Sequence, residues 1–209
     1  MKNIDYSLYL VTDRRWLGGK SLESAVEEAI QGGATVVQLR EKDISSREYL
    51  EIAKRVKEVT DRYRIPLIIN DRIDIAFACD ADGVHLGADD LPVPVARMLL
   101  GQGKIIGASA NSLVDALSME EQGADYLGVG AIFPTGTKTD ADRVTLAELA
   151  DIKAAVKIPV IAIGGIDAEN ASQVIKTGAD GAAIVSAIMA QRDIGGAARN
   201  IANILKLSR

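Results

Sequence analysis

The sequence predicts a single (β/α)8 barrel, and three observations support this fold class. Short β-rich runs alternate with amphipathic segments along the whole chain, a pattern typical of βα units in a parallel sheet. A Gly-Ala pair recurs at 33–34, 123–124 and 178–179, where a helix would end and a strand would begin. The chain has 209 residues, close to the smallest size of this barrel, about 200 residues. We therefore expect one barrel domain over residues 1–209, with a doubly wound open sheet as the alternative.

Eight strands are expected, one in each β-rich run, at residues 8–12, 34–40, 66–70, 83–86, 104–108, 126–130, 159–164 and 181–185. Glycine at 33, 123 and 178 suits the left-handed C-cap of a helix just before a strand. The strands at 66–70 and 159–164 begin with proline, which is tolerated as the first residue of a strand.

Helices are expected between these strands, beginning near Ser21, Ser46, Ile73, Pro92, Ser112, Leu146, Ala168 and Ile194. Several of these positions have Ser, Thr or Asp where a side-chain oxygen can cap the first turn. No linker, low-complexity tract or shift in composition divides the chain. The alternation of strands and helices is therefore expected to continue through one domain.

Composition and charge exclude several classes of protein. Hydrophobic residues make up 48% and charged residues 25%, which is ordinary for a globular protein. The 24 Lys and Arg against 29 Asp and Glu give a net charge of −5, unfavourable for a general nucleic-acid binder or a protein that binds anionic membranes. No run approaches the ~20 apolar residues of a membrane span, and the N-terminus lacks a signal-peptide pattern. A cytoplasmic location is expected.

The strand at 34–40 leads into a cluster of polar side chains. Because side chains alternate between faces, Gln38, Arg40 and Lys42 share one face. They span roughly 13 Å at about 3.3 Å per residue, which is wide enough to bind a diphosphate. The alternative is an amphipathic strand with one solvated face.

Carboxylates follow the next two strands. Asp71 comes directly after the strand at 66–70, and Asp89 and Asp90 come just after the strand at 83–86. In a barrel these ends share one rim with the cations, and Mg²⁺ binds one or two carboxylates together with substrate phosphates. Taken singly, each aspartate could instead be a helix N-cap. His85 is expected to be structural rather than catalytic, whereas Ser109 places a hydroxyl at the rim.

A second anion site is predicted after the last three strands. Residues 133–139 combine hydroxyls, glycine and Lys138, although an ordinary polar turn would look similar. Gly164 and Gly165 follow the seventh strand, where backbone N–H groups can approach a phosphate, and Ser186 follows the eighth. Two phosphorylated substrates would explain both sites.

Six motifs, in unbroken order from the first strand to the seventh, resemble the thiamine phosphate synthase family. They are residues 9–13, 38–43, 69–72, 82–87, 134–138 and 163–166. The resemblance implies a TIM barrel transferase that joins hydroxymethylpyrimidine diphosphate to thiazole phosphate, or to its carboxylated tautomer, with Mg²⁺. The products would be thiamine monophosphate and diphosphate.

The resemblance also implies residue roles. The pyrimidine diphosphate would be bound by Gln38, Leu39, Arg40, Glu41, Lys42, Asn70, Ser109 and Lys138. Of these, Arg40, Lys42, Ser109 and Lys138 would be catalytic. The thiazole phosphate would be bound by Thr135, Gly136, Thr137, Gly165, Val185 and Ser186, and one Mg²⁺ by Asp71 and Asp90. Ala88 and Asp89 depart from the expected longer amide and Glu, but Asp90 itself is in place. Because no paired nucleophile and base is evident in the sequence, we expect diphosphate to leave before the thiazole nitrogen attacks.

Two other functions stay open at this point. The thiazole tautomerase branch of the same superfamily shares the thiazole phosphate site, but it depends on a histidine where this chain offers Asn111. A phosphate-binding regulator could use the same barrel without catalysis, because fold does not determine function. Such a protein would be expected to have lost Asp71, Asp90 or Lys138, and all three are present. A homo-oligomer is compatible with the sequence.

Overall fold

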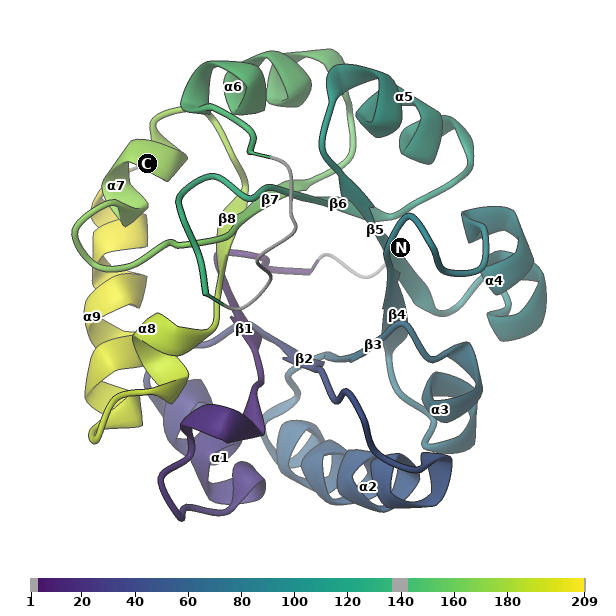
Figure 1. Cartoon of the computed structure of the whole chain (residues 1–209), viewed down its shortest axis with the longest axis vertical. Helices are drawn as coiled ribbons and strands as arrows, with labels where there is room; N and C mark the ends of the chain where they lie inside the picture. Colours follow the sequence, from purple (N-terminus) through teal and green to yellow (C-terminus); the bar gives the residue numbers. More distant parts are fainter. Residues whose placement is uncertain (1–3, 137–142, 209) are drawn as a thin grey trace.

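The computed structural model, which describes residues 4–136 and 143–208, confirms the predicted barrel. Eight parallel strands form one closed ring in chain order, with β8 paired to β1 (Figure 1). The strands are β1 Leu8–Val11, β2 Val36–Leu39, β3 Leu67–Asn70, β4 Gly83–Leu86, β5 Ile105–Ala110, β6 Tyr126–Val129, β7 Val160–Ile163 and β8 Gly181–Ile184.

The helices surround this ring on the outside (Figure 1). They are α1 Leu22–Gln31, α2 Ser46–Tyr63, α3 Ile73–Ala78, α4 Val93–Leu100, α5 Leu113–Glu121, α6 Leu146–Ala155, α7 Ala171–Ile175, α8 Ser186–Met189 and α9 Ile194–Leu207, with a short 3-10 helix, η1, at Arg14–Trp16. Several of these helices begin with a side-chain N-cap, as expected. The Ser21 hydroxyl accepts from Ser24 N at 3.1 Å, and Thr145 forms a capping box with Glu148.

The strand side chains build two hydrophobic cores. One lies inside the ring, where Tyr9, Tyr126 and Ile68 are among the buried residues. The larger lies between the ring and the helices, where Leu8, Leu10 and other alternate strand residues pack. This division follows from the two-residue period of a strand. The interior of the ring at the carboxyl ends of the strands is occupied instead by polar side chains.

The recurring Gly-Ala joints have a clear structural basis. Gly33, Gly123 and Gly178 have φ of 112°, 91° and 91°, the left-handed conformation expected at a helix C-terminus. The aspartate that follows two of these pairs has a role that the sequence does not reveal. Asp125 Oδ2 accepts from Ile106 N and Asp180 Oδ2 accepts from Val160 N, each at 2.7 Å. These carboxylates therefore join the start of one strand to the start of the preceding one.

Strand ends differ from the prediction by one or two residues, and three differences affect the site or the helices. Strand β5 continues to Ala110 because it pairs with β6 through Ala110 and Val129, so Ser109 lies within the strand rather than after it. The seventh helix begins at Ala171 rather than near Ala168, because residues 167–170 form a turn in which Asp167 N donates to Asn170 Oδ1 at 3.0 Å. An additional short helix, α8, begins at Ser186 immediately after β8.

The seam between β8 and β1 leads to a prediction about stability. A Cβ added at Gly181 would lie 1.8 Å from the backbone oxygen of Tyr6, so the strands would have to separate. We expect Gly181→Ala to lower the free energy of unfolding by about 1 to 3 kcal/mol or more, the usual cost of overpacking. Gly103→Ala is the matched control, because a Cβ there meets nothing within 4 Å. Equal urea midpoints for the two variants would contradict the predicted close approach.

Candidate active site

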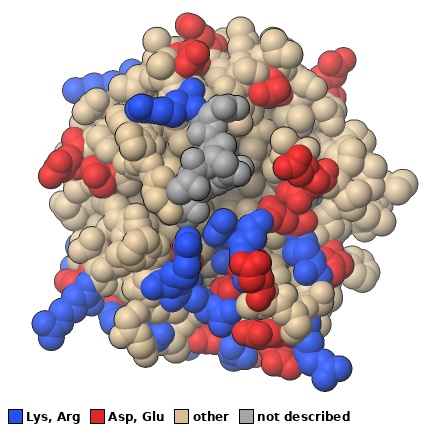
Figure 2. Space-filling view, viewed as in Figure 1, with Lys and Arg blue, Asp and Glu red and all other residues tan. Residues whose placement is uncertain are grey.

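The carboxyl ends of the strands enclose a cavity of about 790 Å³. It is lined by residues at or just after the carboxyl ends of all eight strands. Of the predicted site residues, those that line it are Gln38, Arg40, Lys42, Asn70, Asp71, Asp90, Ser109, Thr135, Gly165, Val185 and Ser186. Lys and Arg side chains gather at this end of the barrel over β1 to β3 (Figure 2). Thr137 and Lys138 lie outside the described residues, and Gly136 is not among the lining residues.

Two carboxylates and one ammonium group meet at the end of β3. Lys42 Nζ donates to Asp71 Oδ2 at 2.5 Å. Asp71 has φ of 64°, a left-handed conformation that Asp and Asn tolerate better than most residues. Asp90 Oδ2 accepts from Gly87 N at 2.7 Å. The pKa of the Asp90 carboxyl is raised, first by burial and then by the charge of the neighbouring Asp71, against which Gly87 and Lys42 act.

This pair of carboxylates fits a magnesium site. The charge of Asp71 disfavours the charged form of Asp90, and a divalent cation bound by both carboxylates would relieve that repulsion. Within residues 4–136 and 143–208, no group of three or more His, Cys, Asp or Glu forms a metal site of its own. The chain would therefore provide two ligands, while phosphate oxygens and water complete the shell that Mg²⁺ prefers.

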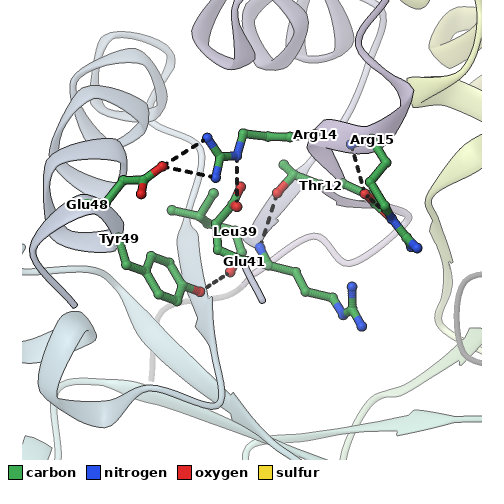
Figure 3. Close-up of polar contacts among 9 residues, drawn as sticks. Thr12, Arg14, Arg15, Leu39, Glu41, Glu48 and Tyr49 are labelled. Atoms are coloured by element: carbon green, nitrogen blue, oxygen red, sulfur yellow. Dashed lines mark hydrogen bonds and ion pairs between the residues drawn. The ribbon is translucent and has the colours of Figure 1, made fainter. Parts of the chain in front are cut away.

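The loop after β2 is held by residues outside the cavity (Figure 3). Arg40 N donates to Thr12 Oγ1 at 3.1 Å, and Tyr49 OH donates to the carbonyl of Leu39 at 2.8 Å. Arg14 Nε donates to Glu41 Oε2 at 2.8 Å, so the Glu41 side chain turns toward Arg14 and α2. These contacts fix the backbone from which Arg40 and Lys42 reach the cavity.

Two predicted pyrimidine diphosphate residues, Leu39 and Glu41, have side chains that do not line this cavity. Leu39 is fully buried in the outer core. The Glu41 side chain is 5% exposed, and its Oε1 has no partner among the described residues. Burial raises the pKa of the Glu41 carboxyl, although Arg14 opposes that shift. Their roles as substrate residues stay predictions, and only their backbone groups would be available for them.

The second predicted anion site has backbone that can approach a ligand closely. Gly164 and Gly165 have φ of 100° and 63°, and a Cβ at Gly165 would lie 2.4 Å from the carbonyl oxygen of Pro134. Both glycines line the cavity, as do Thr135 and Ser186. Ser186 begins α8, where backbone N–H groups have no partner within the helix. These residues come from the arc of β6 to β8, away from Asp71 and Lys42.

The floor of the cavity contains residues that the sequence prediction missed. Ser109 Oγ lies 3.1 Å from His85 Nε2, and His85 Nδ1 lies 2.9 Å from Tyr126 OH. Tyr126 and Tyr9 share a hydrogen bond of 2.7 Å, and Gln38 Nε2 donates to Tyr9 OH at 2.9 Å. The structure brings the Ser109 hydroxyl beside the His85 imidazole, a pairing that is not evident in the sequence. The two-residue alternation of side chains along a strand could have identified Tyr9, Tyr126 and His85, because each lies on the inward face of its strand.

No described helix is both long enough and apolar enough to span a membrane.

Residues 8–188 match a family model described as thiamine monophosphate synthase. The thiamine-phosphate synthase of Clostridium acetobutylicum is 55% identical over 206 residues, covering 99% of this chain and 98% of that protein. The chain belongs to the thiamine monophosphate synthase family. The predicted family is confirmed, and with it the predicted class of activity, a transferase of thiamine biosynthesis.

Two further relatives of the family agree with this assignment. The thiamine-phosphate synthase of Clostridium novyi is 53% identical, covering 97% of this chain and all of that protein (100%). The solved structure of thiamine phosphate pyrophosphorylase from Pyrococcus furiosus is 44% identical, with a TM-score of 0.91 over 98% of this chain and 97% of that one. None of these three relatives is named as a tautomerase, which favours the first of the functions considered above.

Proposed function

We propose that this chain joins 4-amino-2-methyl-5-(diphosphooxymethyl)pyrimidine to 4-methyl-5-(2-phosphooxyethyl)thiazole, or to its carboxylated tautomer. In this reaction the C–O bond of the pyrimidine methylene breaks, a C–N bond to the thiazole nitrogen forms, and diphosphate leaves. The observation that carries the proposal is the meeting of Lys42, Asp71 and Asp90 at one side of a cavity whose other side offers Gly165 and the start of α8. Two anionic ligands would fit these two sides.

The cationic side of the cavity suits the leaving group. Arg40 and Lys42 extend from a backbone held by Thr12 and Tyr49, so their charges are positioned before the substrate arrives. Positive groups placed where negative charge grows stabilise the transition state more than the ground state. Mg²⁺, when bound by Asp71 and Asp90, would neutralise part of the diphosphate charge. Lys138, which lies outside the described residues, is proposed to add a further positive charge.

The thiazole phosphate is proposed to bind at the other side. A helix N-terminus and a glycine turn both present backbone N–H groups to an anion without a side chain in the way. Gly165, Val185 and Ser186 line that part of the cavity. This arrangement would hold the thiazole nitrogen, which is already a free nucleophile, against the pyrimidine methylene. Thr137 is proposed to contribute from outside the described residues.

We also propose that bond breaking precedes bond making. The aminopyrimidine ring is electron-rich and can share the positive charge left on its methylene carbon after diphosphate departs. Nothing in the reaction requires a base to activate the attacking nitrogen. Ser109, on the cavity floor beside His85, would lie at the pyrimidine rather than at the leaving group.

The test of the proposed function uses the purified chain and both phosphorylated heterocycles. We expect release of diphosphate and formation of thiamine monophosphate in the presence of Mg²⁺, and a large loss of both products with a chelator. Omission of either heterocycle should abolish release. Diphosphate release from the pyrimidine substrate alone, at an equal rate, would identify the chain as a hydrolase and overturn the proposal.

The two-sided cavity leads to a prediction about binding. Arg40→Ala should weaken the pyrimidine diphosphate by about tenfold to a hundredfold, because a hydrogen bond to a charged group is typically worth 1.5–3 kcal/mol. Ser186→Pro removes one backbone N–H at a position where a helix accepts proline, and it should mainly weaken the thiazole phosphate. Calorimetry with each substrate alone measures both effects.

The control for the proline variant is Ser186→Ala, which retains the N–H group and should lose less affinity for the thiazole phosphate. Circular dichroism must first show that Ser186→Pro folds. If each folded variant lost the same affinity for both substrates, the two anion sites would not be separate.

The cellular setting follows the same proposal. Both substrates are small phosphorylated molecules, the net charge is −5, and the described helices include no membrane span. We propose a cytoplasmic enzyme that binds neither nucleic acid nor membranes. A single barrel domain would carry its activity. A homo-oligomer stays compatible with this function.

A further inference from the structure

Five polar side chains form a continuous hydrogen-bonded chain across the inside of the barrel. The chain runs from Gln38 on β2 through Tyr9 on β1, Tyr126 on β6 and His85 on β4 to Ser109 on β5. Tyr9 and Tyr126 are each 1% exposed. All five residues line the cavity. The chain therefore joins β2 to β5 along the cavity floor, and its two ends, Gln38 and Ser109, are residues that the family resemblance assigns to the pyrimidine diphosphate.

The surrounding strands leave room for this chain. A Cβ at Gly107 would lie 2.1 Å from Tyr126 Cζ, and a Cβ at Gly128 would lie 2.9 Å from His85 Cε1. Glycine at these two positions lets both rings approach the strand backbones closely. The ring centroids of His85 and Tyr126 are 5.5 Å apart. The packing thus holds the rings in the positions that the hydrogen bonds require.

Counting hydrogens gives this chain a direction. Gln38 donates to Tyr9, so the Tyr9 proton goes to Tyr126, which is its partner at 2.7 Å. The Tyr126 proton then goes to His85 Nδ1, which leaves the imidazole hydrogen on Nε2. That hydrogen is donated to Ser109 Oγ, and Ser109 has its own proton left to donate into the cavity. In this direction each of the four hydrogen bonds joins one donor to one acceptor.

The opposite direction creates a conflict. If Ser109 donated to His85, His85 to Tyr126 and Tyr126 to Tyr9, then Tyr9 would accept from both Tyr126 and Gln38, and its own hydrogen would have no acceptor among these residues. A buried donor without an acceptor typically costs about 1 to 3 kcal/mol. The conflict disappears only if the Gln38 amide turns over and accepts from Tyr9. If Ser109 changes from acceptor to donor toward His85, the Gln38 amide must therefore change from donor to acceptor toward Tyr9.

We propose that Tyr9, Tyr126 and His85 are positioning residues that couple the hydrogen-bonding sense of Gln38 to that of Ser109. With Gln38 donating to Tyr9, its carbonyl oxygen is the acceptor for the cavity, and Ser109 is a donor. The floor then selects a heterocycle that gives a hydrogen bond at one end and accepts one at the other, as an amino group beside a ring nitrogen does. The inference rests on the proposed function for the identity of that heterocycle.

The coupling also explains why Ser109 is not an activated nucleophile. His85 would need an unprotonated Nε2 to take the Ser109 proton, whereas the chain places a hydrogen on Nε2. The burial that raises the pKa of Tyr9 and of Tyr126 keeps both phenols protonated and able to donate. The Ser109 and His85 pair is thus part of a recognition device rather than a catalytic dyad.

The first test measures the His85 tautomer without substrate. His85 is the only histidine, so protein labelled with ¹⁵N-histidine gives ring signals that need no assignment. A pH series is recorded and the alkaline plateau compared between proteins. We expect the hydrogen on Nε2 in the wild type. In Tyr9→Phe, which leaves His85, Tyr126 and Ser109 unchanged, we expect a mixture of tautomers. A hydrogen on Nδ1 in the wild type, or an unchanged tautomer in Tyr9→Phe, would overturn the coupling.

Tyr6→Phe is the matched control. The Tyr6 ring packs against Tyr126 with centroids 5.0 Å apart, but its hydroxyl is not a member of the chain. This variant removes the same atom from the same core and should leave the tautomer unchanged. If Tyr9→Phe fails to fold, Tyr126→Phe breaks the chain at the next position. It should likewise give mixed tautomers.

The second test measures substrate selection. The 4-oxo analogue of the pyrimidine diphosphate exchanges donor and acceptor on this edge of the ring. It has a carbonyl in place of the amino group and an N–H in place of the unprotonated ring nitrogen. We expect the wild type to prefer the 4-amino substrate in kcat/KM. Tyr9→Phe should reduce that preference by about tenfold to a hundredfold, because each end can then turn independently. The KM for the thiazole phosphate should not change.

The outcomes separate this inference from the proposed function. A wild-type protein that forms no thiamine monophosphate would overturn the function, yet the tautomer measurement would still decide the coupling. A synthase whose preference for the 4-amino substrate is the same in Tyr9→Phe would overturn the coupling and leave the function intact.

Discussion

Replacing the 2-methyl group of the pyrimidine diphosphate with trifluoromethyl should slow the chemical step by at least about a hundredfold, equivalent to roughly 2.7 kcal/mol in activation free energy. In the proposed mechanism the methylene carbon carries positive charge once the C–O bond breaks. Trifluoromethyl withdraws electron density from the ring and destabilises that charge. Single-turnover rapid-quench measurements at saturating substrate isolate the step.

The 2-ethyl analogue is the control for size, because it resembles trifluoromethyl in bulk but donates electrons. Its rate should stay near that of the natural substrate. Calorimetry with each analogue, the thiazole phosphate omitted, should give similar affinities, since Arg40 and Lys42 are proposed to bind the diphosphate and not the 2-substituent. A trifluoromethyl rate close to the ethyl rate would favour concerted displacement. The cations would then serve binding more than bond breaking.

The parts of the fold that could be predicted from sequence are those governed by local rules. Gly33, Gly123 and Gly178 have the left-handed conformation expected from their positions, and the strands lie where the β-rich runs predicted. Because the barrel fold places chemistry at the carboxyl ends of strands, the amino-acid sequence alone was enough to assign Arg40, Lys42 and Asp71 to one rim. Their presence in one cavity follows from that rule.

The remaining features depend on contacts between residues far apart in sequence. Tyr9 and Tyr126 are 117 positions apart and meet only because β1 and β6 face each other across the ring. The Glu41 side chain turns from the cavity because Arg14, which follows β1, binds it. The length of β5 is determined by its pairing with β6. No periodicity within a single segment contains this information, because the cavity floor is formed by strands that come together only in the closed ring.

Asp71→Asn should reduce the apparent affinity for Mg²⁺ by at least about tenfold, since even residues that only support a metal ligand typically contribute 10–100-fold. The substitution removes one negative charge while preserving shape. Asparagine also tolerates the left-handed backbone that Asp71 adopts, with φ of 64°, whereas alanine would add strain. Turnover should therefore fall most at limiting Mg²⁺ and recover in part at high Mg²⁺.

Folding should be affected much less than turnover. The ion pair between Lys42 and Asp71 is partly exposed, with side chains 51% and 23% accessible, and such pairs typically contribute only about 0 to 1 kcal/mol. Asp89→Asn is the matched control, because Asp89 is exposed in the loop that contains Asp90 and does not line the cavity. It removes the same charge and should leave the Mg²⁺ dependence of turnover unchanged. Normal turnover of folded Asp71→Asn at limiting Mg²⁺, or equal losses in both variants, would show that Asp71 is not a ligand. The metal would then have to be bound by the substrates with Asp90 alone.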